Sequence, residues 1–139
     1  MIVDTSVWSL FLRRRPGDVA PDQREVVLEL RRLVRDGQVL MLGDIRQELL
    51  TGIRDAVSFD RLRSYLRAFQ DEPVTVDDRE RAALFANTLR KRGVQASHVD
   101  VLLCSMAGGT GSPLFTTDSD FAACAAALPF SLYRALPGS

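Results

Sequence analysis

Short apolar runs alternate with segments of helical periodicity along the chain. The runs at 1–3, 38–42 and 114–116 are too short for a helix and rich in Ile, Val, Leu and Met, which predicts buried strands. Two further short strands are expected at 73–76 and 131–133. Helices are predicted in between, over about 7–11, 21–36, 43–51, 59–69, 77–92 and 97–107, and from 119 onward.

The clearest helix opens at Pro21 and ends before Gly37, two residue types that are typical of those positions. Its apolar residues recur three and four positions apart, at Val26, Val27, Leu30, Leu33 and Val34. Gly52 is expected to end the helix that starts near residue 43, and the Gly-rich stretch 108–111 is expected to form a turn.

Short strands separated by helices favour an α/β fold, in which helices cover both faces of a central, mostly parallel sheet in three layers, α/β/α. The 139 residues, 46% of them hydrophobic, suit a single domain over 1–139. Ligands of such sheets bind outside the carboxyl ends of the strands, near a reversal of strand order. Candidate chemistry is therefore sought at that edge.

Composition and charge exclude several classes of protein. Eighteen basic and 18 acidic residues give a net charge of zero, so the strongly positive field of a protein that coats nucleic acid is missing. Nearly all the basic residues are Arg, which suits phosphate recognition but also reflects codon usage in some genomes. No apolar run approaches the ~18 residues that span a membrane, and Asp4 interrupts any secretory signal. We expect a cytoplasmic protein, with Cys104 and Cys124 in its core.

Several acidic residues have an ordinary explanation as helix caps, because a helix begins with unpaired N–H groups that carboxylates satisfy. Asp22 with Glu25, and Asp77 with Glu80, have the spacing of a capping box. Asp44 is likewise expected to cap the helix that starts there.

Four other acids stand at the ends of strands or in the early turns of helices: Asp4, Glu48, Asp100 and Asp118. Capping remains an alternative for most of them. Asp4 stands at the start of a helix, and Asp100 has capping-box spacing to Ser97. Asp118 and Asp120 open the last helix, so a capping role stays open for both.

In a parallel sheet these four positions converge on one edge. Carboxylates packed together repel one another unless divalent cations neutralise them, and hard oxygen ligands suit Mg²⁺ or Mn²⁺. The reaction that such a site favours is in-line phosphodiester hydrolysis, with one metal activating water and a second stabilising the leaving oxygen. Other mechanisms lack their residues, because His98 is the single histidine and no phosphate-binding loop is present.

Four motifs occur in order along the chain: MIVDTSVW at 1–8, IRQELLTG around Glu48, HVDVLLCSMA around Asp100 and TTDSDF at 116–121. Together they resemble the PIN-domain ribonucleases, specifically the VapC toxins of toxin-antitoxin pairs, from residue 1 to about 133. The resemblance implies a catalytic, metal-binding site made of four acids: Asp4, Glu48, Asp100 and Asp118. It adds Asp120 as a fifth metal ligand and Ser6 as a hydroxyl that orients Asp4 or its metal.

The resemblance also implies a homodimer, cleavage of structured RNA (tRNA, rRNA or mRNA) with Mg²⁺ or Mn²⁺ as cofactor, and a small VapB-like antitoxin that docks in a groove and covers the site. Some arginines are candidates for binding RNA phosphates, with plain solvation as the alternative: Arg13, Arg14, Arg15, Arg61, Arg63 and Arg67. Apolar residues near Trp8, Leu12 and 59–69 could bind a partner, with a core role as the alternative.

Other functions stay open at this point. A PIN nuclease of RNA maturation would have the same residues. A catalytically inactive scaffold would bind RNA or a partner without cutting it, although the complete acidic set argues against a loss of activity. A phosphorylated receiver domain is also a small α/β fold, but it needs a lysine at the end of a late strand, and Lys91 lies in a predicted helix.

Overall fold

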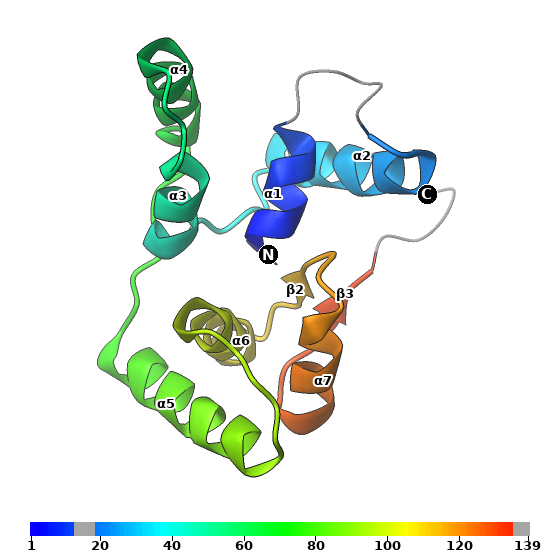
Figure 1. Ribbon diagram of the computed structural model, residues 1–139, viewed down its shortest axis with the longest axis vertical. Coiled ribbons are helices and arrows are strands. Elements are labelled where there is room, and N and C mark those ends of the chain that lie inside the picture. The colour runs from blue at the N-terminus through cyan, green and yellow to red at the C-terminus, as the bar shows by residue number, and fades with distance from the viewer. Residues whose placement is uncertain (13–18, 135–139) are drawn as a thin grey trace.

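The computed structural model describes residues 1–12 and 19–134 (Figure 1). Within these ranges, short strands and helices follow one another in the order β1 (Ile2–Val3), α1 (Thr5–Phe11), α2 (Pro21–Arg35), α3 (Gly43–Leu50), α4 (Ala56–Leu66), α5 (Val76–Lys91), α6 (His98–Thr110), β2 (Leu114–Phe115), α7 (Asp120–Ala127) and β3 (Leu132–Tyr133). Each predicted helix is therefore present, with bounds that shift by a few residues.

A parallel sheet in the order β1, β2, β3 lies at the centre of the molecule. Ile2 of β1 pairs with Leu114 of β2. Single parallel bridges extend the pairing on the other side of β1, from Ile2 to Leu40 and from Met41 to Asp71. After β1, the chain first places the bridge-forming residues Leu40, Met41 and Asp71 on one side of this strand. It later places β2 and β3 on the other side, so the strand order reverses at the carboxyl end of β1.

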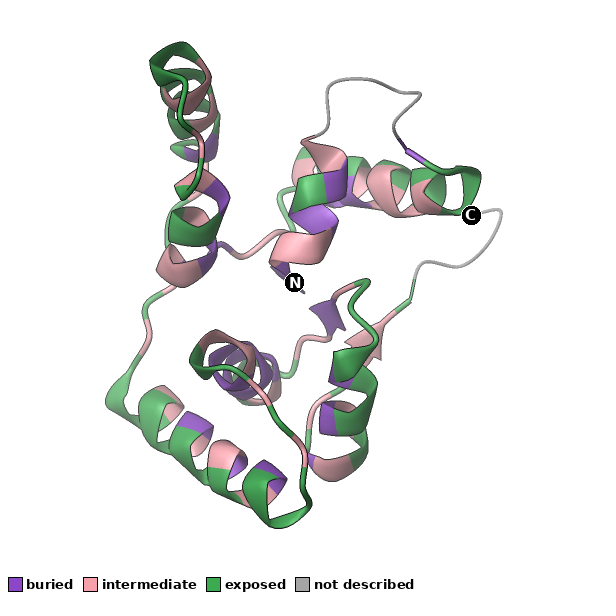
Figure 2. Cartoon of the chain, viewed as in Figure 1, coloured by how far each residue is buried: buried purple, intermediate pink, exposed green. Residues whose placement is uncertain are grey.

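Helices cover both faces of this sheet. In Figure 1, α1 and α2 lie above the labelled strands, and α5, α6 and α7 lie below them. Buried residues face inward from each layer (Figure 2), and α6 is the most enclosed helix, with residues 101–107 all buried. Trp8, Leu102 and Phe121 are among the largest fully buried side chains. The predicted α/β class with a central parallel sheet is confirmed.

The strand predicted at 73–76 is wrong, because 73–75 are irregular, with Thr75 as the N-cap, and Val76 begins α5. The Thr75 hydroxyl accepts a hydrogen bond from the Asp78 N–H (3.1 Å), and the Asp78 carboxylate accepts one from the Thr75 N–H (2.9 Å). This reciprocal capping box fixes the start of α5 at Val76. The strand predicted at 38–42 is reduced to isolated bridges.

The cap predicted for α2 is also wrong. The helix begins at Pro21, and the Gln23 side chain accepts a hydrogen bond from the Ala20 N–H (3.1 Å). Asp22 and Glu25 do not form the expected box, because the Gln23 side chain, one position after Asp22, accepts the hydrogen bond from the Ala20 N–H instead.

Two further caps differ from their predictions. Thr75 with Asp78, and not Asp77 with Glu80, caps α5. Asp44 lies within the first turn of α3, whose N-cap position is occupied by Leu42. Asp44 therefore faces the positive end of the helix dipole without capping it.

α6 is longer than predicted, since it continues through two glycines of the stretch 108–111. The Thr110 hydroxyl donates to the Met106 carbonyl oxygen (2.8 Å), which supports the last turn. Gly111, with φ of 70°, adopts the left-handed conformation that ends the helix. Only this last glycine forms the predicted turn.

Cys104 and Cys124 are buried free thiols, which confirms their predicted place in the core. Burial raises the pKa of both thiols, so they stay protonated near neutral pH and act as apolar packing. Over residues 1–12 and 19–134, no helix has the length and apolar character needed to cross a membrane.

Candidate functional site

Asp4 lies at the carboxyl end of β1, where the strand order reverses. Its backbone N–H donates to the Phe115 carbonyl oxygen (2.8 Å), which fixes it beside β2. The residue is 8% exposed, and its Oδ2 accepts hydrogen bonds from the hydroxyls of Ser6 and Thr116, both at 2.8 Å. Asp4 occupies the N-cap position of α1, but its side chain makes no capping bond. The capping alternative therefore does not account for this carboxylate.

Thr116 connects two of the candidate acids. Its Oγ1 donates to Asp4 and accepts a hydrogen bond from the Asp118 N–H (3.0 Å). The Ser6 hydroxyl lies 3.3 Å from the same oxygen and accepts from the Thr117 N–H (3.0 Å). Sequence reasoning gave Thr116 no role. Its signal was a hydroxyl residue that directly follows an apolar strand and precedes Asp118 by two positions.

Asp118 and Asp120 both lie at the start of α7, and both are exposed. Asp118 Oδ1 accepts a hydrogen bond from the Asp120 N–H (2.9 Å), so the capping alternative is correct for one oxygen of Asp118. The other oxygen, Oδ2, takes no part in that turn. Capping and ligand binding are therefore compatible at Asp118.

Asp100 forms the capping box that its spacing to Ser97 indicates. Its Oδ2 accepts from the Ser97 N–H (3.2 Å), and its own N–H donates to the Ser97 hydroxyl (3.1 Å). Asp100 and Asp120 line one groove of about 700 Å³ bordered by α5, α6 and α7. The first turns of α6 and α7 thus present their acids to a shared space.

Glu48 is exposed on α3, and its carboxylate accepts a hydrogen bond from the Thr5 hydroxyl. Thr5 directly follows Asp4, so α3 brings Glu48 to the same end of β1. Glu48 and Val99 also line one cavity of about 340 Å³. Because Val99 precedes Asp100, Glu48 borders both the start of α1 and the first turn of α6.

A family model described as the PIN domain matches residues 1–127, which is most of the chain. The chain belongs to the PIN-domain family. Two solved structures share the fold of this PIN domain. FitAcB from Neisseria gonorrhoeae matches with a TM-score of 0.74 and 19% identity over 96% of both chains. VapBC-5 from Mycobacterium tuberculosis, a member of the VapBC family of toxin-antitoxin systems, matches with a TM-score of 0.65 and 19% identity, also over 96% of both chains. No curated protein matches the chain.

The acids of this PIN domain suit a divalent cation in kind, because they are hard oxygen donors. In each of Asp4, Asp100 and Asp118, hydrogen bonds from the described residues reach only one carboxylate oxygen. Among residues 1–12 and 19–134, however, no three His, Cys, Asp or Glu side chains are close enough together to hold a metal ion. Ligation of one ion by three acids would therefore require side-chain rotation.

Three of the acids act on one buried group of the PIN domain. Burial raises the pKa of the Cys124 thiol, and the negative charges of Asp100, Asp120 and Asp118 raise it further. Asp100 has the largest effect of the three. These three carboxylates therefore lie around Cys124 of α7. Asp4 and Glu48 lie instead near the start of α1, where Ser6 donates to Asp4 and Thr5 donates to Glu48.

The candidate RNA-binding arginines have different surroundings. Three of them lie outside the described residues: Arg13, Arg14 and Arg15. On α4, Arg63 pairs with Asp60 (2.8 Å), and its guanidinium lies 5.9 Å from the centre of the Phe59 ring. Arg61 lines an apolar groove, and Arg67 is the C-cap residue of α4. A role of these residues in RNA binding stays a prediction.

Proposed function

We propose that this PIN domain is a metal-dependent endoribonuclease of the VapC type, the toxin of a toxin-antitoxin pair, which hydrolyses phosphodiester bonds of RNA in the cytoplasm. The observation that carries the proposal is Asp4, buried at the reversal of strand order and held by two hydroxyl groups. Nuclease activity is general in the PIN-domain family. VapBC-5, which has the same fold, belongs to a family of toxin-antitoxin systems.

The residues that would hold Mg²⁺ or Mn²⁺ are Asp4, Glu48, Asp100 and Asp118, with Asp120 as a fifth contributor. When bound, divalent cations lower the pKa of a bound water and neutralise the charge that develops on the phosphate oxygens. The chain itself supplies oriented oxygens. Ser6 and Thr116 hold Oδ2 of Asp4 and leave Oδ1 for a ligand, so they orient the carboxylate without neutralising it.

A VapB-like antitoxin is the proposed partner, and an apolar groove of about 600 Å³ among α1, α3 and α4 is its proposed binding surface. Leu12, Leu62 and Tyr65 line this groove. Trp8, for which a partner surface and a core role were both open, is fully buried and packs edge-to-face against Phe69, so the core role is correct. We also propose a homodimer, which light scattering would detect as a doubled mass.

The test of the proposed function is cleavage of folded tRNA, rRNA and mRNA fragments by the purified chain in Mg²⁺, Mn²⁺ or EDTA. Asp4→Asn keeps an oxygen that can accept hydrogen bonds from Ser6 and Thr116 but removes the charge. We expect metal-dependent cleavage by the unchanged chain and a loss of about 100-fold or more in the variant, whose Tm in EDTA should equal that of the unchanged chain.

Asp22→Asn is the matched control, since it removes one carboxylate from the exposed first turn of α2. It should cut RNA like the unchanged chain. Full cleavage by Asp4→Asn would overturn the proposed function, and cleavage that persists in EDTA would overturn its metal dependence.

A further inference from the structure

The groove that Asp100 and Asp120 line extends beyond the candidate acids. Its volume is about 700 Å³, and its walls come from the carboxyl end of α5, the segment 94–97 and the first turns of α6 and α7. This volume lies within the range of about 300–1,000 Å³ that is usual for small-molecule sites. The groove is therefore large enough for a nucleotide.

The lining of the groove combines three kinds of surface. Ala86 and Leu89 of α5 provide an apolar wall. Gln95 offers an amide with both donors and an acceptor, and Arg90 offers a planar guanidinium. Each surface suits one part of a nucleotide. The face of the base can pack on the apolar wall, its hydrogen-bonding edge can bind the Gln95 amide, and the phosphate can accept two hydrogen bonds from the Arg90 guanidinium.

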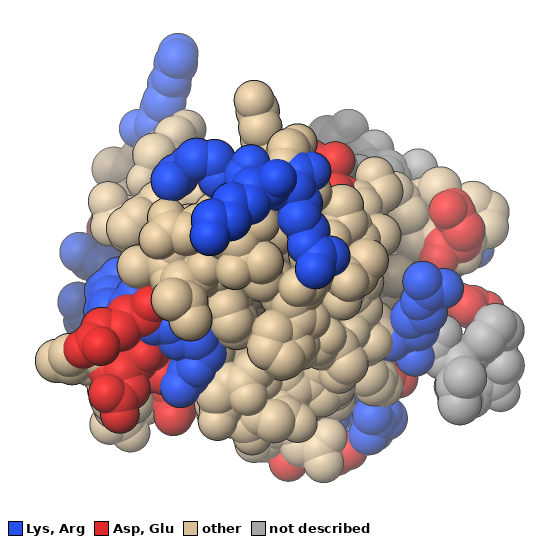
Figure 3. All heavy atoms as spheres, turned by 90° about the horizontal axis from the view of Figure 1, so that it is seen from below, with Lys and Arg blue, Asp and Glu red and all other residues tan. Residues whose placement is uncertain are grey.

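Positive charge gathers where α5 ends. Arg90, Lys91 and Arg92 are consecutive, and none forms an ion pair within the described part of the chain. Arg90 donates to the neutral Asn87 side chain (3.1 Å). Figure 3, the view from below, shows several Lys and Arg side chains close together on this face, with a group of acidic side chains beside them. Cations also stabilise the carboxyl end of a helix, but that effect does not account for the place of Arg90 in the groove.

We propose that this groove binds one nucleotide of a single-stranded RNA segment, next to the phosphate that is cut. Arg90 binds the neighbouring phosphate, and Gln95 contacts the edge of the base. The inference rests on the proposed function, because Asp100 and Asp120 join the groove to the candidate acids. These two carboxylates repel a phosphate unless a cation lies between them, whereas Arg90 binds one directly.

The test is RNA binding by the full chain, measured as the fluorescence anisotropy of short labelled single-stranded RNA with Ca²⁺ in place of Mg²⁺. We expect Arg90→Ala to raise the Kd about tenfold and to lower the salt dependence of binding by about 0.7 in log–log slope, the value for one lost phosphate contact. Gln95→Ala should change the preference among oligo(A), oligo(C), oligo(G) and oligo(U) and leave that slope unchanged.

Arg24→Ala is the matched control, because Arg24 is an exposed arginine of α2 that also has no ion pair with a described residue and lies outside the groove. Its Kd should stay within about twofold of the unchanged chain. Circular dichroism melting should give the same Tm for both variants. We expect this because both arginines are exposed, and the hydrogen bond from the Arg90 guanidinium to the exposed Asn87 lies at the surface.

Three results would overturn the inference: no RNA binding by the unchanged chain, equal losses in Arg90→Ala and Arg24→Ala, or no loss in Arg90→Ala. The proposed nuclease activity is tested independently of this groove. Binding that depends on Arg90 in a chain that cuts no RNA would contradict the nuclease and support the groove. Cleavage by a chain whose RNA binding does not depend on Arg90 would support the nuclease and contradict the groove.

Discussion

Two hydroxyl groups hold the Asp4 carboxylate, one from the nearby Ser6 of α1 and one from Thr116, which follows β2 far along the chain. Both donate to Oδ2, so the side chain is fixed in one orientation before any ligand binds. A carboxylate fixed in this way loses less conformational entropy when it binds a cation. The Thr116 hydroxyl also accepts a hydrogen bond from the Asp118 N–H. Thr116 therefore connects Asp4 and Asp118 through its single hydroxyl group.

Replacing Thr116 by Val is expected to lower RNA cleavage by about 10–100-fold, because the orientation of both Asp4 and Asp118 depends on its hydroxyl. Both hydrogen bonds of this hydroxyl are lost, so the free energy of unfolding should fall by about 1–3 kcal/mol. Cleavage rates, urea unfolding and calorimetric Mn²⁺ binding measure these effects. Affinity for Mn²⁺ should fall with activity.

Two variants control this prediction. Thr116→Ser restores the hydroxyl and should recover most of the activity. Thr117→Val changes an exposed neighbour whose backbone N–H alone contacts Ser6, and it should cut normally. Equal activities of Thr116→Val and Thr116→Ser would show that the hydroxyl does not position the acids.

Single residues differ in how far the sequence predicts them. Asp4 could be singled out because an acid directly after a fully apolar strand has few structural uses. Asp100 could not be decided, since its capping bond to Ser97 uses one oxygen and leaves the other for a ligand. Thr116 was missed, because a threonine at a strand end is common and its partner Asp4 lies at the other end of the chain.

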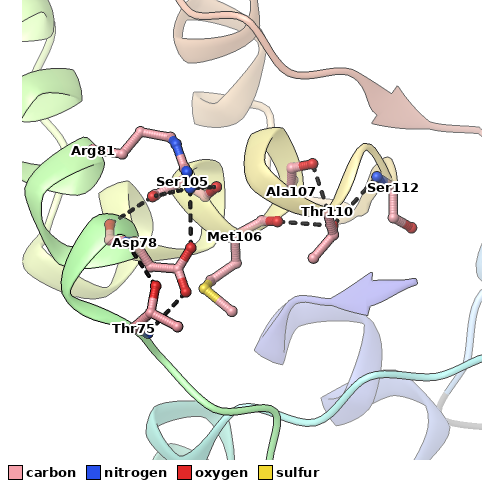
Figure 4. A network of polar contacts seen from close by, with 8 residues as sticks. All are labelled: Thr75, Asp78, Arg81, Ser105, Met106, Ala107, Thr110 and Ser112. Atoms are coloured by element: carbon pink, nitrogen blue, oxygen red, sulfur yellow. Dashed lines mark hydrogen bonds and ion pairs between the residues drawn. The ribbon is translucent and has the colours of Figure 1, made fainter.

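At the scale of whole elements, a polar network fixes α6 against α5 (Figure 4). Arg81 of α5 donates to the Asp78 carboxylate (3.0 Å) and to the Ser105 carbonyl oxygen of α6 (3.2 Å). The buried Ser105 hydroxyl in turn donates to the Asp78 carbonyl oxygen (2.7 Å). Asp78 also completes the capping box with Thr75, so one residue both starts α5 and anchors it to the helix that carries Asp100.

Replacing Asp78 by Asn tests this network through pH. Hydrogen bonds from Thr75, together with the Arg81 charge, hold the pKa of the Asp78 carboxyl below its ordinary value of 3.8. A carboxyl with a lowered pKa in the folded state adds stability above its unfolded pKa, and this stability is lost as the pH falls through the folded pKa. Asp78→Asn should cost about 1–2 kcal/mol at pH 7 and progressively less below pH ~4.

Urea unfolding of both proteins at pH 7 and pH 3 measures the difference. Asp77→Asn, on the exposed neighbour of Asp78, should cost much less at either pH. A difference between Asp78→Asn and the unchanged chain that is the same at both pH values would contradict the electrostatic part of this account.

Elements were predicted well where periodicity and breakers agree, as for α2 between Pro21 and Gly37. Predictions failed where two local signals compete. Residues 73–76 contain apolar residues typical of a strand, but the capping box of Thr75 and Asp78 begins a helix at Val76. Gly108 and Gly109 are typical of a turn, yet α6 continues through both to Thr110, whose hydroxyl donates to the Met106 carbonyl oxygen, and ends at Gly111.

At the scale of the whole molecule, zero net charge conceals a separation of charges. Acids lie near the carboxyl end of β1 and at the start of α7, whereas Arg90, Lys91 and Arg92 follow one another where α5 ends. Arg90 lines one groove together with Asp100 and Asp120. Composition could not predict this groove, because its walls come from segments that only the fold brings together. Zero net charge is therefore compatible with both the proposed cation site and the proposed phosphate-binding groove.

The same separation predicts how divalent metal should affect the stability of the molecule. A ligand that binds only the folded state stabilises it by about 2.7 kcal/mol at a concentration 100 times its Kd, which corresponds to a rise in Tm of about 10 °C for a chain of this size. We expect Mn²⁺, measured against EDTA by differential scanning fluorimetry, to raise the Tm of the unchanged chain and of Asp22→Asn by this order. Asp4→Asn should lose most of the rise, because it removes the buried charge at the reversal of strand order. An equal rise in Asp4→Asn would place the bound metal away from Asp4, and no rise in the unchanged chain would contradict metal binding by these acids.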